Sequence, residues 1–400
     1  MKKSIFKVLA AVLAVADAAI MSTVAYADAT VPSDLTYAQA YSLDSGLLQF
    51  GGNDSLGIAA TESYSYPSTV SVLGIFPVKT VNISAQSRSS VVISGQPFGC
   101  ILDTKHILVV GLTDVTTESG IVNPAARAGI ATGDYLVSIN GVALDDVSTV
   151  SRLVRESDGG ELKIVVNGSD GLKTVRLHPV FSKDEHAYRL GVWIRDSEAG
   201  VGMLSFYSPE SGVAAGLGHS LNDADTGKSF AANGGKAYTA GILAIKKGAD
   251  GNPGQLCGCI NSSSVLGRVL DNSDKGVYIA AERLDGELHE VAYAGEVHKG
   301  DAELYVSLNG GTAQRYSAEI TEVRRGDGKN LVIKVTDKEL LGLTGGIVQG
   351  MSGAPILQDG RLAGVLTHVL VNDADVGYGI FAETMVDRAN EVAAAQKKAS

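Results

Sequence analysis

The sequence predicts a mainly β protein with two folded domains behind an export segment. Its 400 residues are 45% hydrophobic, enough to bury more than one core, because a single domain usually runs to about 100–200 residues. Forty-eight glycines and a single Trp accompany many short Val, Ile and Thr runs that end in Gly, Asn or Asp. This pattern favours short strands and tight turns over long helices.

The first 27 residues carry the pattern of a secretory signal. Three lysines precede an apolar run over residues 8–16, and Ala25-Tyr26-Ala27 suits signal peptidase cleavage. Asp17 interrupts the apolar stretch, so an uncleaved N-terminal anchor is the alternative. In both cases we expect the rest of the chain to lie outside the cytoplasm.

Charge and cysteine content exclude several classes of protein. The whole chain carries a net charge of −11, and removing residues 1–27 takes away three Lys and one Asp, a net +2, which leaves −13. Such a chain repels nucleic acid. Cys257 and Cys259 would share one face of a strand in poor geometry for a mutual bridge. We therefore expect no disulfide scaffold. We also expect no metal site, because paired ligand motifs are missing, and no cofactor.

Residues 28–90 divide into a tether and strands. Residues 28–68 mix Ser, Tyr, Gly and Asp without periodicity, which predicts a poorly ordered tether. Strands are predicted over residues 70–75, 79–83 and 91–93, each bounded by Pro, Gly or Ser.

Residues 95–180 predict a small α/β unit. A short helix ends at Gly129, where a left-handed C′ residue is easiest for glycine. A strand over residues 135–139 leads into Asn140-Gly141, which suits a type I′ turn, and residues 147–154 fit an amphipathic helix.

Residues 188–390 predict a closed barrel or a pair of barrels. Short apolar strands with turns between them recur throughout this stretch of about 200 residues. The predicted strands lie at residues 191–194, 202–206, 277–279, 304–306, 331–335 and 362–366.

Ser352 is the candidate nucleophile, because it lies between glycines in Gly350-Met351-Ser352-Gly353-Ala354-Pro355. Such a turn exposes the hydroxyl and lets substrate backbone approach closely. The backbone N–H groups of Gly350 and Ser352 would form an oxyanion hole. A purely structural turn between two strands is the alternative.

A serine needs a base, and His219 is the candidate. Its neighbours in Gly216-Leu217-Gly218-His219 are small enough to leave the ring accessible. His368, on the predicted strand after the serine, is the rival. Surface positions are expected for the other five histidines, which are His106, His178, His186, His289 and His298.

An acidic residue is expected to orient the base. Asp337, Asp223 and Asp225 are the candidates. Asp337 suits equally well the role of N-cap for a helix that begins at Lys338.

Residues 128–141 resemble a PDZ domain, whose signature A-G-[IL]-x-x-G-D-x-[IL]-x-x-[IV]-N-G they match closely. PDZ domains capture an extended peptide, often a C-terminus, as an added strand. The resemblance implies a peptide groove near residues 107–112, formed by Val109, Val110, Gly111 and Leu112. The alternative is a module that only packs on the catalytic domain.

Several separated motifs resemble the SpoIVB-type serine peptidases of endospore-forming bacteria. They are Phe76-Pro77-Val78-Lys79-Thr80-Val81-Asn82, Trp193-Ile194-Arg195-Asp196, Gly216-Leu217-Gly218-His219 and residues 344–353. The resemblance implies a PDZ-like domain over residues 95–180, followed by a chymotrypsin-like β-barrel serine peptidase domain over 188–390. His219 is then the base, Asp337 the orienting acid and Ser352 the nucleophile. Ala354 departs from the family, which commonly has a second serine there, and Asp337 precedes Ser352 by only 15 residues.

The same resemblance implies a function. Members of the family are exported from the forespore, process themselves and cleave a membrane-bound regulator, which triggers activation of a mother-cell sigma factor. This chain is then expected between the forespore and mother-cell membranes, in peripheral or transient contact with a membrane. An HtrA-like quality-control protease is one alternative, although there the protease precedes the PDZ domain. A non-catalytic PDZ scaffold is the other.

Overall fold

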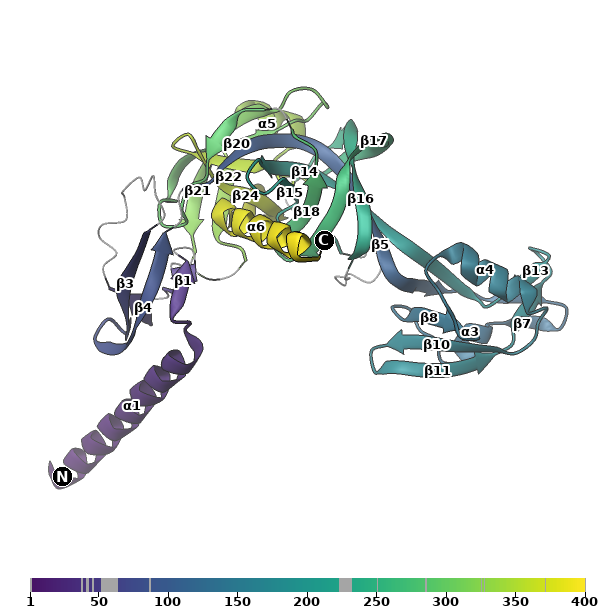
Figure 1. Cartoon of the computed structure of the whole chain (residues 1–400), viewed down its shortest axis with the longest axis horizontal. Coiled ribbons are helices and arrows are strands. Elements are labelled where there is room, and N and C mark those ends of the chain that lie inside the picture. The colour runs from purple at the N-terminus through teal and green to yellow at the C-terminus, as the bar shows by residue number, and fades with distance from the viewer. Residues whose placement is uncertain are drawn as a thin grey trace.

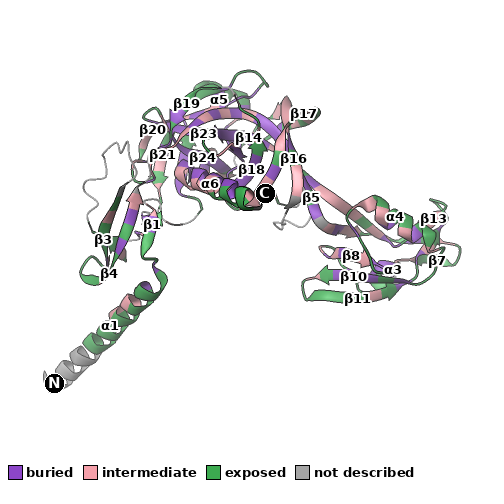
Figure 2. Ribbon diagram, viewed as in Figure 1, coloured by how far each residue is buried: buried purple, intermediate pink, exposed green. Residues whose placement is uncertain are grey.

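The computed structural model describes residues 2–36, 39–40, 43–44, 47–51, 64–85, 88–222, 232–249, 251–284, 286–324, 326, 328–370 and 372–399. Figure 1 shows three parts: an N-terminal helix with a small sheet, a central body, and a domain reached by a long strand ribbon. Buried residues concentrate in the central body and in the core of the distant domain (Figure 2).

The N-terminal part has its own small core. Helix α1 (Lys2–Thr30) leads into a four-stranded sheet of order β1-β4-β3-β2. Its strands are β1 (Asp34–Thr36), β2 (Leu48–Phe50), β3 (Tyr64–Val72) and β4 (Phe76–Ala85). Leu35 and Phe50 are buried here with Val70, Val81 and Ile83. The prediction of a tether over residues 28–68 is therefore wrong in part, because strands of three residues are too short to show a period of two.

The central body begins with a closed six-stranded barrel. The order is β5-β14-β15-β18-β17-β16, and β16 pairs back to β5, for instance at Ala237 and Cys100. The strands are β5 (Ser90–Leu112), β14 (Val192–Ser208), β15 (Val213–Gly216), β16 (Ala232–Lys246), β17 (Gln255–Ser273) and β18 (Gly276–Ala281). Phe98, Leu102, Leu204 and Ile279 fill its interior.

The second half of the body is another closed barrel, of order β20-β21-β22-β25-β24-β23. Its elements are β20 (Gly300–Val306), β21 (Gln314–Val323), β22 (Leu331–Val335), α5 (Lys338–Thr344), β23 (Pro355–Gln358), β24 (Arg361–Leu370) and β25 (Asp373–Phe381). The C-terminal helix α6 (Ala382–Ala399) buries Met385 and Ala389 against residues of both barrels. The predicted pair of barrels is confirmed.

The distant domain interrupts the first barrel between β5 and β14. Its elements are β6 (Val115–Thr117), β7 (Gly120–Val122), α3 (Pro124–Arg127), β8 (Tyr135–Ile139), β9 (Val142–Ala143), α4 (Val147–Glu156), β10 (Leu162–Gly168), β11 (Gly171–Leu177), β12 (Val180–Ser182) and β13 (Ala187–Arg189). Gly129, Asn140 and Gly141 all have positive φ, as the predicted helix end and type I′ turn require.

The order of domains differs from the expected one, in which the PDZ-like unit ends before the barrel begins. Residues 98–104 of β5 pair with β16, and the outer part of the same strand pairs with β8 in the distant domain. The first strand of the peptidase barrel thus precedes the unit that was expected to precede the whole barrel. One continuous strand that serves two domains carries no boundary signal in its sequence.

Candidate active site

The turn that carries Ser352 is held by the first barrel. Gly350 and Gly353 have φ of 94° and 98°, which favour glycine. A side chain at 353 would collide with the Met203 carbonyl of β14. Met203 N–H donates to the Ser352 carbonyl at 2.7 Å, and Ser205 Oγ donates to the Gly353 carbonyl at 2.8 Å. The turn that carries Ser352 therefore lies at the junction of the two barrels.

The two predicted oxyanion donors are available. Throughout the described part of the chain, neither the N–H of Gly350 nor that of Ser352 has a hydrogen-bond acceptor. Gln349, just before them, is fixed by the start of β17: its N–H donates to the Gly254 carbonyl at 2.9 Å, and its carbonyl accepts from Leu256 N–H at 2.8 Å. Two preorganised N–H groups in one turn suit a developing oxyanion.

His219 reaches this junction through a sharp bend. After β15, Leu217 and Gly218 both have φ of 67°, and Leu217 N–H donates to the Met203 carbonyl. The Nδ1 atom of His219 lies 2.7 Å from the Ser220 carbonyl oxygen. A carbonyl oxygen only accepts, so Nδ1 carries the hydrogen and Nε2 of the neutral ring is left as a proton acceptor.

Burial and the nearby charge of Lys329 lower the pKa of His219, although the Ser220 carbonyl opposes them. Burial first, and then the charges of His219 and Lys329, lower the pKa of His368 to about 4. Both rings are therefore neutral at neutral pH. A neutral imidazole with a free Nε2 is the form that a general base needs.

Ser352, His219 and His368 form one cluster. The Ser352 hydroxyl donates to the Thr367 carbonyl, and the next residue, His368, packs its ring on His219 with centroids 4.6 Å apart. Gly218 also lies against the Thr367 side chain. In this rotamer the serine proton is directed at the Thr367 carbonyl.

Asp337 lies outside this cluster. Its Oδ1 accepts from the N–H groups of Glu339 and Leu340 at 2.9 and 3.0 Å, and its Oδ2 accepts from Ser317 N–H at 3.3 Å. The carboxylate is thus the N-cap of α5. The structure gives it no bond to His219, whose Nδ1 is occupied by the Ser220 carbonyl. Asp223 and Asp225 lie outside the described residues.

The predicted peptide strand, Val109 to Leu112 with Val110 and Gly111 between them, is already paired with another strand along one edge. On one side Val109 N–H donates to the Asp134 carbonyl, and on the other side residues 109–112 pair with β14. The prediction for these four residues is wrong, because the returning strand β14 covers the edge they were expected to offer.

A groove of about 350 Å³ lies instead between α4 and the outer part of β14. Val147, Val150 and Val154 line it from the helix, and Val192 and Ile194 line it from the strand. The valines repeat at i, i+3 and i+7, so the helix face was readable in the sequence. The sequence did not indicate that the outer part of β14 would lie opposite this helix face.

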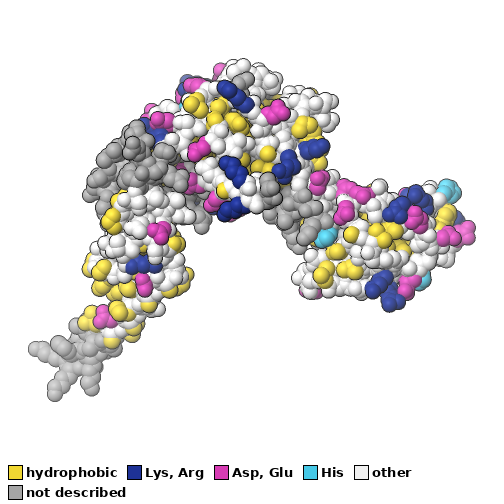
Figure 3. Space-filling view, viewed as in Figure 1, with side chains coloured by type: hydrophobic (Ala, Val, Ile, Leu, Met, Phe, Trp, Pro, Cys, Tyr) yellow, Lys and Arg dark blue, Asp and Glu magenta, His cyan; other side chains and the backbone are white. Residues whose placement is uncertain are grey.

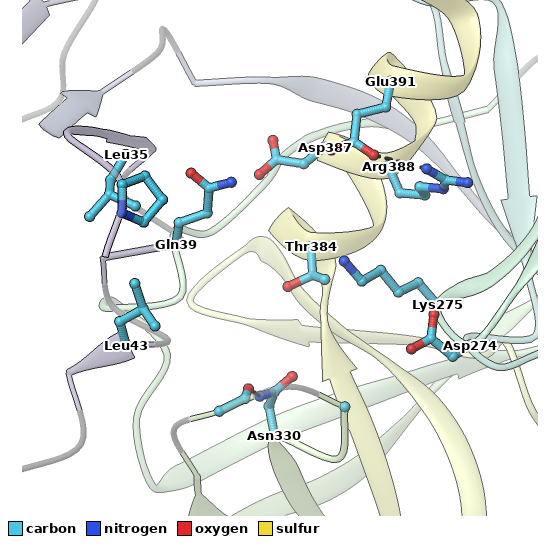
Figure 4. A pocket seen from close by; sticks show the side chains of 13 residues that line it. Leu35, Gln39, Leu43, Asp274, Lys275, Asn330, Thr384, Asp387, Arg388 and Glu391 are labelled. Carbon is cyan, nitrogen blue, oxygen red and sulfur yellow. Dashed lines mark hydrogen bonds and ion pairs between the residues drawn. The ribbon is translucent and has the colours of Figure 1, made fainter. Parts of the chain in front are cut away.

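A separate cavity of about 340 Å³ lies between the N-terminal segment and α6, away from the serine cluster (Figure 4). Leu35 and Leu43 line one side, and Asp387, Arg388 and Glu391 line the other. Burial raises the pKa of Asp387 to about 6. No group of three potential metal-ligating side chains occurs among the residues with described positions.

Comparison with known proteins assigns two regions of the chain. The model of the family described as SpoIVB peptidase S55 matches residues 186–386, and a PDZ domain model matches residues 123–167. A relative named as a zinc metalloprotease, from Clostridium acetobutylicum, is 28% identical over 116 residues, which are 28% of this chain. The chain spans about a third of the length of that relative, 34%.

Solved structures of proteases are similar to parts of the chain. The active form of the Rv3671c protease from M. tuberculosis is 17% identical, with a TM-score of 0.29, over 49% of this chain and 74% of that one. The HtrA-type protease AlgW with a tripeptide is 11% identical, with a TM-score of 0.30, over 48% of this chain and 55% of that one. Because the match to the peptidase model covers half of the chain, the chain belongs to the SpoIVB peptidase S55 family of serine peptidases and carries a PDZ domain.

Proposed function

We propose that this chain is a serine endopeptidase in which Ser352 is the nucleophile and His219 the general base. The observation that carries the proposal is the cluster at the barrel junction, where a half-buried neutral imidazole whose Nδ1 is hydrogen-bonded stacks on His368, the residue after the one that accepts from the hydroxyl of the glycine-framed Ser352. Two backbone N–H groups without acceptors complete it.

The geometry supports the following sequence of steps. Rotation of the Ser352 side chain brings Oγ to Nε2 of His219, which takes the proton as Oγ attacks the scissile carbonyl. The N–H groups of Gly350 and Ser352 hold the oxyanion. His219 then donates its proton to the leaving amine. A water molecule, deprotonated in turn by His219, attacks the acyl group and releases the free Ser352 hydroxyl.

The Ser220 carbonyl takes the place usually held by an acid beside the base. It fixes the tautomer of His219 as a carboxylate would, but it carries no full charge to stabilise the imidazolium. Asp337 is proposed as a positioning residue, because it begins α5 and this helix leads directly into residues 345–352.

The substrate of this site is proposed to be a protein. Family membership supports the finer proposal that the chain is exported, processes itself and cleaves a membrane-bound regulator, leading to mother-cell sigma factor activation. The PDZ domain is proposed to capture a peptide along the open edge of β14, opposite α4, where the groove supplies valine side chains.

Mass analysis of the purified chain tests the proposal. Wild type, incubated alone and with casein, should yield fragments, whereas Ser352→Ala should stay intact and leave casein uncut. Ser263→Ala, an exposed serine on β17, is the matched control and should behave as wild type. Undiminished cleavage by Ser352→Ala would remove the assignment. Intact wild type under all conditions would favour a non-catalytic scaffold.

A further inference from the structure

The hairpin between β3 and β4 exposes an apolar cluster. Leu73, Ile75 and Phe76 are 48%, 73% and 37% exposed, and Leu47 beside them is 49% exposed. We refer to these four residues as the hairpin tip. No charged residue occurs from Ser71 to Val78. A cluster of exposed apolar side chains on a folded domain marks a surface that another apolar phase covers.

Helix α1 supplies the second observation. Its segment Val12–Thr30 is long and apolar enough to cross a bilayer, and only 6% of it is buried. The end of the helix is packed on the same small sheet: Ala27 shares a core with Val70 and Val81, and Lys79 Nζ donates to the Asp28 carbonyl at 2.7 Å.

The pairing of the strands shows which way the hairpin tip extends. Lys79 of β4 lies level with Asp28, and Asn82, further along β4, lies level with Asp34, where β1 runs parallel to β4. The tip, at the other end of β4, is therefore on the side of the body of α1. Figure 1 shows the hairpin and α1 at the same end of the molecule, and Figure 3 shows apolar atoms exposed there.

The depth of the tip follows from element geometry. Ile75 and Phe76 lie three to four residues before Lys79 in the chain, which is about 10–13 Å at about 3.3 Å per residue. Measured back along α1 from Asp28, the same distance takes about seven to nine residues at about 1.5 Å per residue. It ends near residues 19–21, within the apolar segment.

Two backbone N–H groups of the tip are paired within the protein. Leu73 N–H donates to the Leu47 carbonyl at 2.7 Å, and Ile75 N–H donates to the Val72 carbonyl at 3.2 Å. Each N–H group that is paired within the protein lowers the cost of placing the turn against an apolar phase.

We propose that the hairpin tip is a lipid-contact site that enters the headgroup boundary of the bilayer crossed by α1. A single helix allows the attached domains to swivel, whereas a helix and a hairpin together hold the sheet, and the catalytic body behind it, in one orientation. The proposal is independent of the catalytic assignment.

Tryptophan fluorescence of the full chain tests it. Trp193 is the only tryptophan, so Trp193→Phe removes the background and Ile75→Trp places a reporter at the tip. The chain is reconstituted in phosphatidylethanolamine–phosphatidylglycerol vesicles with brominated acyl chains. We expect a blue-shifted emission and several-fold stronger quenching than for Thr80→Trp, an exposed control on β4 beyond the level of Asp28.

Phe76→Trp is a second tip reporter, in case the first disturbs the hairpin. Equal quenching at the tip and at Thr80→Trp, or none at any tip reporter, overturns the proposal. Absence of quenching is also the result expected if a protein or a second copy of the chain covers the tip.

Discussion

At the scale of single residues, the state of His219 decides whether the cluster can act. A base must be neutral, and burial together with Lys329 lowers its pKa. Lys329 has no ion pair among the described residues, and its Nζ lies 4.8 Å from the centre of the Tyr378 ring. Tyr378 pairs with His368 across β24 and β25, so this lysine borders the cluster.

Replacing Lys329 by Met should move the pH dependence of catalysis. The base is active when deprotonated, so activity is lost as pH falls through the pKa of His219. Removing a positive charge that lowers this pKa raises it, and the acid limb of kcat/KM against pH should shift to higher pH. Lys163→Met, exposed on β10, should leave the profile unchanged. A shift to lower pH would contradict the assigned base.

The two histidines should differ in severity. His219→Ala should lose about as much turnover as Ser352→Ala, about 10⁶-fold, because members of one catalytic unit fail together. His368→Ala should lose less, since it removes only a packing partner of the base. Single-turnover hydrolysis of one peptide by each variant makes the comparison. The opposite ranking would transfer the role of base to His368.

At the scale of elements, strand β14 joins the PDZ domain to the central body. Its outer residues, 192–194, line the groove beside α4, and Met203 and Ser205 hold the turn that carries Ser352. The PDZ domain is therefore attached through the barrel strand that positions Ser352, and not through a flexible linker.

Helix α5 gives a prediction that separates two roles of Asp337. Asp337→Asn retains an Oδ1 acceptor and should keep both stability and kcat near wild type, whereas Asp337→Ala removes the cap and should lower the free energy of unfolding by about 1 kcal/mol. Urea denaturation and kcat are measured on both variants. A loss of about 10⁴ in kcat for Asp337→Asn would instead identify an orienting acid.

At the scale of the whole molecule, α6 joins the two barrels and carries two half-buried acids, Glu383 and Asp387. Glu383 accepts from Ala294 N–H at 2.7 Å, and burial raises its pKa to about 8, against 4.5 for a free side chain. Burial likewise raises the pKa of Asp387 to about 6. At a pH between the unfolded and the folded pKa values, these two carboxyl groups are therefore protonated in the native state and ionised in the unfolded chain.

This proton difference predicts that stability falls with rising pH. Between pH 4.5 and about 8 the folded chain binds the extra proton at Glu383, so the free energy of unfolding decreases by up to about 1.4 kcal/mol per pH unit. Glu383→Gln should remove this part of the slope. Urea denaturation at pH 5, 6.5 and 8 measures it, with Glu161→Gln, an exposed residue, as control. An unchanged slope in Glu383→Gln would contradict the prediction.

The mainly β class, the PDZ motif and the glycine frame around Ser352 were predictable from the sequence, because each is written in a few neighbouring residues: alternating apolar positions, turn dipeptides and glycines at positive φ. His219 was proposed as the base on similar local grounds, from the small residues before it. The cap formed by Asp337 was one of the two roles that the sequence left open for this residue, because the N–H groups it accepts from lie only two and three residues away. The strand edge that faces α4 and the passage of β5 and β14 through two domains required the tertiary structure. They depend on which distant backbone pairs with each strand, and strand partners that lie more than 100 residues away, such as Val92 and Tyr207, leave no local pattern in the chain.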